Sequence, residues 1–105
     1  MKIIETSFFT KKVNSLISDE DYHNLQNQLI ANPKQGKIIR GSNGLRKFRW
    51  KLSRTGKSGG VRIIYYWISK EEIILMLLVY SKKEQDNLTS AQLKILKSIV
   101  EKELK

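Results

Sequence analysis

The stretch LRKFRWKLSRTGKSGGVRIIYYW, from Leu45 to Trp67, decides how the middle of this chain folds. Its first part alternates apolar and basic residues, the period-two pattern of a β-strand with one face on the core. The part after Gly60 is rich in β-branched and aromatic residues, which are also typical of a strand. The segment between them, 53–60, is basic, ends in Gly-Gly, and is too long for a two-residue turn. We therefore expect two antiparallel strands joined by a basic loop.

The alternation gives the first of these strands an apolar face and a basic face. The side chains expected on the core are Phe48, Trp50 and Leu52. The other face would carry Lys47, Arg49 and Lys51, spaced about 7 Å apart in a row. Like charges at that spacing repel one another and lower stability unless an anion lies against them. Cations that protect an edge strand against aggregation are the alternative explanation.

Upstream of this stretch, the pattern predicts a short edge strand, 1–5, and then two helices. The first helix has its apolar stripe at Phe9, Val13, Leu16 and Ile17. The second begins at an N-cap, Ser18, followed by three acidic residues, and ends before Pro33. Its stripe is Tyr22, Leu25, Leu29 and Ile30. The glycine-containing segment 34–44 is read as a loop with room for a short strand around Lys37 to Arg40.

Downstream, the nearly uninterrupted apolar run Ile73 to Tyr80 predicts a strand covered on both faces. Thr89 and Gln92 have the spacing of a capping box, and Leu93, Leu96, Val100 and Leu104 mark a last helix. Three successive strands joined by turns imply an antiparallel meander. The expected architecture is one α+β domain over residues 1–105, in the order β-α-α-β-β-β-α.

The distribution of charge indicates a polyanionic partner. The net charge is +10, and no Asp or Glu occurs between Tyr22 and Lys70. That segment holds eleven basic residues: Lys34, Lys37, Arg40, Arg46, Lys47, Arg49, Lys51, Arg54, Lys57, Arg62 and Lys70. A basic middle without acids is typical of a nucleic-acid-binding surface. A generally basic, solvated surface is the alternative.

Several classes of protein are disfavoured by what the sequence lacks. The chain has no cysteine, which excludes disulfides and thiolate zinc sites and fits a reducing cytoplasm. We expect no signal peptide at the N-terminus, and the longest apolar run is too short to cross a membrane. The single histidine, His23, lies among polar neighbours in a predicted helix, so a solvated position is expected rather than a catalytic one.

Arg62 is the most informative single residue. It lies in a strand that is otherwise apolar and aromatic, where a guanidinium is costly unless its charge is met. Its donors would match the oxygens of a phosphate. The alternatives are an arginine that reaches solvent at the strand end, or one that pairs with Glu71 or Glu72.

The meander brings further residues to Arg62. The end of one strand lies beside the start of its antiparallel neighbour, so Tyr80, Lys82 and Lys83 should lie near Arg62 and the basic loop. The result is a basic basin with tyrosines at its rim. Tyr65, Tyr66 or Tyr80 could stack on unpaired bases, or belong to the core instead.

A basin of this composition permits metal-free cleavage of RNA without demanding it. Acids are scarce, which disfavours a two-metal nuclease. RNA supplies its own nucleophile, the 2′-hydroxyl. Cleavage then needs a base for that proton, a cation for the phosphate and an acid for the 5′-oxygen. A lysine could be the base only if neighbouring cations lowered its pKa well below the usual value of about 10.4.

Four motifs resemble those of the RelE/HigB superfamily of bacterial type II toxins. The resemblance is closest to the HigB-like branch of that superfamily. The motifs are GLRKFRW (Gly44–Trp50), RTGKSGG (Arg54–Gly60), RIIYYW (Arg62–Trp67) and LLVYSKKEQDNLTSAQ (Leu77–Gln92). Members of the family are endonucleases that cleave mRNA in the ribosomal A site of the 30S subunit and are neutralised by a cognate antitoxin. The resemblance therefore implies a RelE-like fold, a cytoplasmic toxin without cofactor or metal, and these three partners: antitoxin, ribosome and mRNA.

The resemblance also assigns roles to residues. Arg62 would stabilise the transition-state phosphate, Lys47 and Arg49 match the family's basic pair on the preceding strand, and Lys82 matches the basic residue after the last strand. Tyr80 is added as a catalytic candidate. The expected RNA contacts are Lys57, Arg54, Lys51, Arg46 and Lys83. RelE has a tyrosine where this chain reads Asp86-Asn87-Leu88, so the general base stays open. A non-catalytic RNA- or DNA-binding module that uses the same basin is the alternative.

Overall fold

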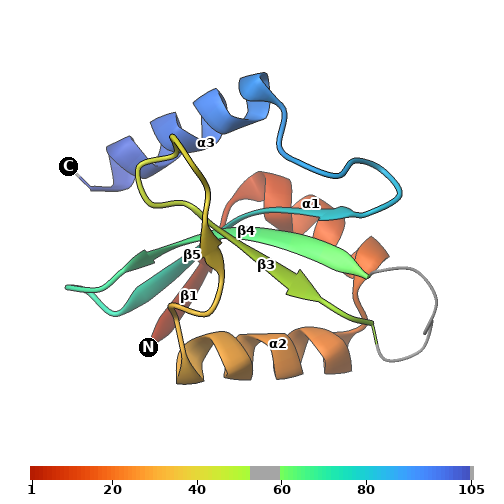
Figure 1. The fold of residues 1–105 in the computed structure, drawn as a ribbon. Helices are drawn as coiled ribbons and strands as arrows, with labels where there is room; N and C mark the ends of the chain where they lie inside the picture. The colour runs from red at the N-terminus through yellow and green to blue at the C-terminus, as the bar shows by residue number, and fades with distance from the viewer. Residues whose placement is uncertain (53–59, 105) are drawn as a thin grey trace.

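The computed structural model of the chain describes residues 1–52 and 60–104 and is drawn in Figure 1. The helices are α1 (Ser7–Leu16), α2 (Asp19–Ala31) and α3 (Ser90–Glu103). The strands are β1 (Lys2–Glu5), β2 (Lys37–Ile38), β3 (Arg46–Trp50), β4 (Val61–Ile68) and β5 (Ile73–Ser81). The α+β class is as predicted.

The five strands form one sheet in the order β1-β5-β4-β3-β2. The meander β3–β4–β5 is antiparallel, as predicted. The short strand expected around Lys37 to Arg40 is present as β2, which covers Lys37–Ile38 and pairs with β3. β1 pairs with β5 in parallel, a pairing that the sequence did not predict. The first strand does lie at an edge of the sheet, as expected.

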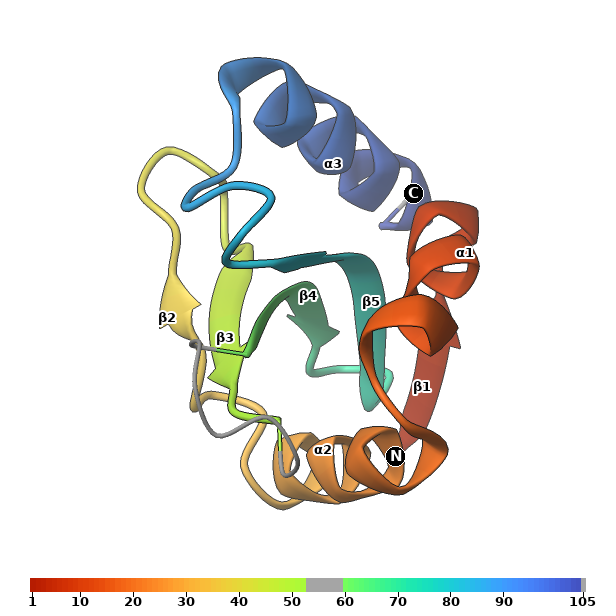
Figure 2. The same ribbon diagram turned by 90° about the vertical axis from the view of Figure 1, so that its right-hand side faces the viewer.

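Helices cover the two faces of the sheet separately, as Figure 2 shows for α2 and α3. On one face, Val61, Ile63 and Tyr65 of β4 pack with residues of α1 and α2. On the other face, Ile64 of β4 packs with Leu96 and Val100 of α3. Phe48, Trp50 and Leu52 contact the first of these cores, so the predicted apolar face of β3 is confirmed. β5 contributes to both cores, as predicted for a strand covered on both sides.

The helix ends follow the sequence signals. Ser18 caps α2, Asn32 before Pro33 ends it, and Thr89 with Gln92 forms the predicted capping box of α3. The apolar stripes were predicted one residue too long. Ile30 is 39% exposed in the last turn of α2, and Leu104 is 52% exposed at the C-cap of α3.

An irregularity in β5 matters for the site. Ile64 pairs with Leu78 while Tyr65 pairs with Met76, so Leu77 is an extra residue in β5. A bulge of this kind shifts the alternation by one residue. Tyr80 therefore lies on the same face as Leu75 and Leu77, in the core beneath α3, instead of on the opposite face.

Within residues 1–52 and 60–104, no helix is long and apolar enough to span a membrane.

Candidate nucleic-acid interface

One face of the meander brings the main predicted site residues together. Arg49 of β3 lies opposite Arg62 of β4, and Arg62 lies opposite Tyr80 of β5. Lys47, two residues before Arg49, lies on the same face opposite Ile64. Side chains of directly opposite residues in an antiparallel pair share a face, with Cβ atoms about 5 Å apart. The register thus sets three cations and a tyrosine across adjacent strands, as the meander predicted.

Burial changes steadily along this row. Arg49 is exposed, Arg62 is 6% exposed and Tyr80 is 1% exposed. The prediction that Tyr80 lies at the rim is wrong, because the bulge in β5 turns its ring into the core beneath α3. Arg62 is also remote from Glu71 and Glu72. The turn that holds those residues follows Ile68, about 20 Å along β4 from Arg62 at 3.3 Å per residue, so neither glutamate is within reach of its guanidinium.

The phenol of Tyr80 is the polar group at the inner end of the row. Its hydroxyl is buried and has no hydrogen-bond partner in the described part of the chain. Burial raises the pKa of Tyr80, the nearby charge of Arg62 lowers it in part, and the carboxylate of Asp86 raises it. The hydroxyl is thus held in its protonated form. Asp86 is an acid close to this basic row that sequence reasoning did not assign to the site.

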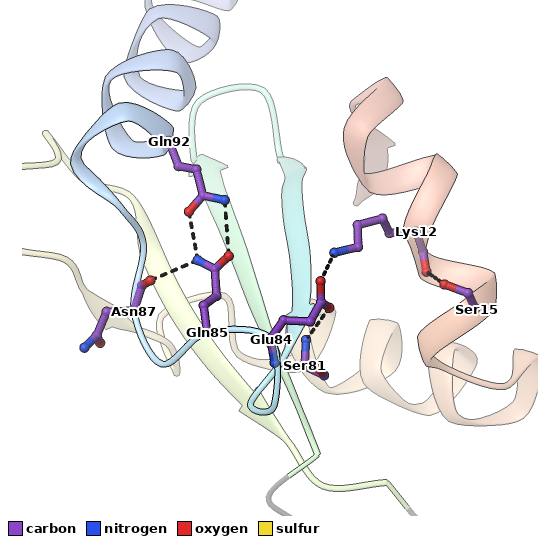
Figure 3. A network of polar contacts seen from close by, with 7 residues as sticks. All are labelled: Lys12, Ser15, Ser81, Glu84, Gln85, Asn87 and Gln92. Atoms are coloured by element: carbon purple, nitrogen blue, oxygen red, sulfur yellow. Dashed lines mark hydrogen bonds and ion pairs between the residues drawn. The ribbon is translucent and has the colours of Figure 1, made fainter.

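The connection between β5 and α3 is held by polar contacts at both of its ends (Figure 3). Near its start, Glu84 accepts a hydrogen bond from the backbone N–H of Ser81 at 3.1 Å and forms an ion pair with Lys12 of α1 at 2.6 Å. These contacts lower the pKa of Glu84, with Lys12 the main cause. The backbone N–H of Lys82 donates a longer hydrogen bond, of 3.4 Å, to the carbonyl of Gly60.

At the other end of the connection, Gln85 and Gln92 exchange side-chain amide hydrogen bonds of 2.8 and 3.3 Å. Gln85 also donates to the backbone carbonyl of Asn87 at 2.9 Å, as Figure 3 shows. The side-chain oxygen of Asn87 accepts a hydrogen bond from Nζ of Lys47 at 3.0 Å. The loop is therefore linked to the basic face of β3. Asn87 was not among the residues predicted for the site, and its polar side chain in the loop after Lys82 was the available signal.

Other predicted RNA contacts are not brought into this row. Arg46 lies on the opposite face, opposite Tyr65, and its guanidinium donates to the carbonyls of Lys34 and Gly36 at 3.0 and 2.8 Å. Lys51 and Lys83 are exposed, beyond the ends of β3 and β5. Arg54 and Lys57 lie outside the described residues. The predicted solvated position of His23 is confirmed, since it lies exposed on α2.

The structure also separates the tyrosines. Tyr65 is fully buried in the other core, where its hydroxyl donates to the carbonyl of Pro33 at 2.7 Å and accepts from the N–H of Gly36 at 2.9 Å. Stacking of Tyr65 on a base is therefore wrong, because both its ring and its hydroxyl are already engaged. Tyr66 is half-buried against the core beneath α3.

In residues 1–52 and 60–104, no three His, Asp or Glu side chains are grouped so that they could hold a metal ion.

Comparison with known proteins gives the fold a precedent. No protein-family model matches the sequence. A chain of the intact E. coli RelBE toxin–antitoxin complex superimposes with a TM-score of 0.60 at 18% sequence identity, covering 76% of this chain and 94% of that chain. A mutant of E. coli toxin RelE in the free state superimposes with a TM-score of 0.58 at 15% identity, covering 81% and 86%. The chain has the RelE-like fold that the motifs predicted.

Proposed function

We propose that this chain is the toxin of a type II toxin–antitoxin pair and acts as a ribosome-dependent endonuclease on mRNA. The observation that carries the proposal is the row Lys47–Arg49–Arg62–Tyr80 on one face of a RelE-like sheet. Two arginines directly opposite each other repel, and a phosphate between or above them would relieve that repulsion. The likeness in fold to RelE, at low identity, supports the proposal.

The reaction proposed is transesterification at a phosphodiester. The 2′-oxygen attacks phosphorus, the bond from phosphorus to the 5′-oxygen breaks, and the products are a 2′,3′-cyclic phosphate and a 5′-hydroxyl. Arg62 would donate to the phosphate oxygens, on which negative charge grows, and Arg49 and Lys47 would hold the same strand. Removal of metal would leave the reaction unchanged.

Two protons must move in this reaction. The raised pKa of Tyr80 keeps its hydroxyl protonated at neutral pH, as a donor to the leaving 5′-oxygen must be. Asp86, close enough to Tyr80 to affect that pKa, is a carboxylate that could take the proton of the 2′-hydroxyl. Lys82 follows β5 at the same end of the sheet and would add positive charge.

The partners proposed are the A site of the ribosome, mRNA and a cognate antitoxin in the cytoplasm. A chain with a net charge of +10 and a basic row on one face needs an inhibitor that covers the row, neutralises it, or does both. RelBE, with which this chain shares a fold, is a toxin–antitoxin complex.

A second candidate function is RNA binding without cleavage. The observation in its favour is the burial of Tyr80, which is 1% exposed, so its hydroxyl reaches a substrate only if the surroundings move.

Induction of the chain with and without the neighbouring open reading frame tests the proposal that the chain is a toxin. Growth arrest that the neighbour relieves, and that Arg62→Ala abolishes in a folded protein, supports a toxin. Normal growth on induction of the parent chain alone would contradict it.

A further inference from the structure

A groove at the β2 edge of the sheet continues from the proposed cleavage site. Its volume is about 370 Å³, and it is lined by Gln35, Lys37, Lys47, Phe48 and Arg49. Three of these five residues are basic and none is acidic. Lys37 and Gln35 have no role in the site proposed above, so the groove extends beyond it.

The groove exists because β2 is short. β2 pairs only with Lys47 and Arg46, and β3 continues for three further residues, to Trp50. Among the described residues, no strand lies beside Phe48 and Arg49 on the β2 side of the sheet. An uncovered strand edge offers backbone hydrogen-bonding groups to a ligand. The lining therefore combines cationic side chains with exposed backbone.

Charge is arranged along a continuous path from the site to this groove. Lys37 lies opposite Lys47 on β2 and β3, and Arg49 lies opposite Arg62 on β3 and β4, so two like-charged pairs share β3. All four side chains lie on the same face, because opposite residues share a face and Lys47 and Arg49 are two apart. The path crosses two strand spacings, about 10 Å of sheet. Lys37, Lys47 and Arg49 form no ion pair with a carboxylate in residues 1–52 or 60–104.

Phe48 adds an aromatic ring to the groove wall. It is half-buried, and its ring is tilted by 46° to that of Trp50 at a centroid distance of 6.0 Å. Phe48 also packs on the core with α1 and α2, on the face of β3 opposite Lys47 and Arg49, so it lines the groove only at the edge of the strand. The cations on the other face are the groups that would follow an RNA backbone.

We propose that this groove is a second subsite, in which Lys37 binds a phosphate of the single-stranded RNA next to the one held at Arg62. The proposal rests on the proposed function in that it takes RNA as the ligand. The repulsion between Lys37 and Lys47 then lowers the stability of the free protein, and bound RNA would relieve it. The strand would cross the sheet from β4 over β3 to β2.

Binding of an uncleavable single-stranded RNA, methylated at every 2′-oxygen, tests the subsite by fluorescence anisotropy over a range of salt concentrations. Lys37→Ala should weaken binding about fivefold near 0.1 M salt and reduce the slope of log K against log salt by about 0.7, the value of one phosphate contact on a single strand. Lys37→Arg should bind like the parent. Lys70→Ala is the matched control, because Lys70 is an exposed lysine in the turn at the far end of β4.

The subsite is refuted if Lys37→Ala binds the RNA no worse than Lys70→Ala, or if the affinity falls with no change in the salt slope. It is also refuted if Lys37→Ala binds RNA like the parent but escapes its antitoxin, which would assign the groove to an acidic protein segment. Because the probe cannot be cleaved, a loss of affinity in Lys37→Ala supports the subsite even in a chain that cleaves no mRNA. If the parent chain cleaves mRNA and Lys37→Ala binds the RNA as tightly as the parent does, the proposed function is upheld and the second subsite is refuted.

Discussion

Arg49 and Arg62 lie directly opposite each other on β3 and β4, one exposed and the other 6% exposed. Two guanidinium groups on the same face of an antiparallel pair raise the free energy of the folded chain, and the buried one has the higher desolvation cost. A polyanion bound across the two strands would reduce the repulsion between these two cations. The pair therefore connects the stability of the fold to its proposed ligand.

Replacement of the exposed arginine should stabilise the free protein. In Arg49→Gln, the like-charge repulsion is removed while a polar side chain is kept. We expect a gain of about 0.5 kcal/mol, or about 2–4 °C in Tm, that shrinks as salt rises. Thermal unfolding at low and high salt measures it. The same variant should bind single-stranded RNA more weakly. A lower Tm in Arg49→Gln would show that Arg49 is held by favourable contacts instead.

Tyr80→Phe tests whether the hydroxyl of Tyr80 acts in catalysis or stabilises the fold. The hydroxyl is buried with no partner in residues 1–52 and 60–104, so its removal should leave Tm unchanged or raise it slightly. If Tyr80 donates a proton to the leaving oxygen, growth arrest should fall sharply. Growth curves and circular dichroism melts of the same variant give both values. Full toxicity in Tyr80→Phe would remove Tyr80 from the proposed mechanism.

Alkaline pH should destabilise the fold through three tyrosines. Burial raises the pKa values of Tyr22, Tyr65 and Tyr80, and a hydrogen bond from Tyr22 to Glu5 adds to the first. In the unfolded chain tyrosines lose their protons near pH 10, whereas the folded chain keeps them. Stability from this source is complete below that pH and falls as pH rises from about 10 through the higher folded values. Urea midpoints at about pH 9 and about pH 11 measure the loss, which Tyr22→Phe should reduce. An equal loss in that variant would exclude Tyr22 as a source.

Asn87 should position Lys47 for the proposed reaction. Its side-chain oxygen accepts from Nζ of Lys47 at 3.0 Å. Asn87→Leu removes the acceptor at similar size, whereas Asn87→Asp keeps it. We expect weaker growth arrest in Asn87→Leu and retained arrest in Asn87→Asp. The free energy of unfolding should change by less than about 1 kcal/mol in either variant, because the contact is exposed. Equal growth arrest in the two variants would show that the contact has no part in positioning Lys47.

Much of the fold could be predicted because local signals were strong. The alternation around Phe48 and Trp50, the Ser18 and Thr89 caps and the apolar run of β5 each specify an element without tertiary information. The parallel pairing of β1 could not be predicted in this way. A strand of four residues carries no local signal for its partner, and β5 lies about 70 residues further along the chain.

The site could be predicted where it depends on register and not where it depends on irregularity. Antiparallel order places Arg62 beside Arg49 and near the end of β5, whereas its pairing with Tyr80 in particular depends on the extra residue Leu77. The burial of Tyr80 follows from the extra residue Leu77 in β5, and an apolar run gives no sign of a bulge inside it. The partner of Arg46 is backbone in a distant loop, which no spacing in the sequence reveals.

The central claim is that Arg62 makes this fold cleave mRNA on the ribosome. Mapping of mRNA 5′ ends after brief induction tests it most directly, in the parent chain, in Arg62→Ala and in Lys70→Ala as control. We predict new ends at codon-linked positions, carrying 5′-hydroxyls, in the parent and in Lys70→Ala. They should be absent in Arg62→Ala, whose fold is verified by its circular dichroism melt. New codon-linked ends of equal abundance in a folded Arg62→Ala chain, or none in the parent during growth arrest, would contradict the claim.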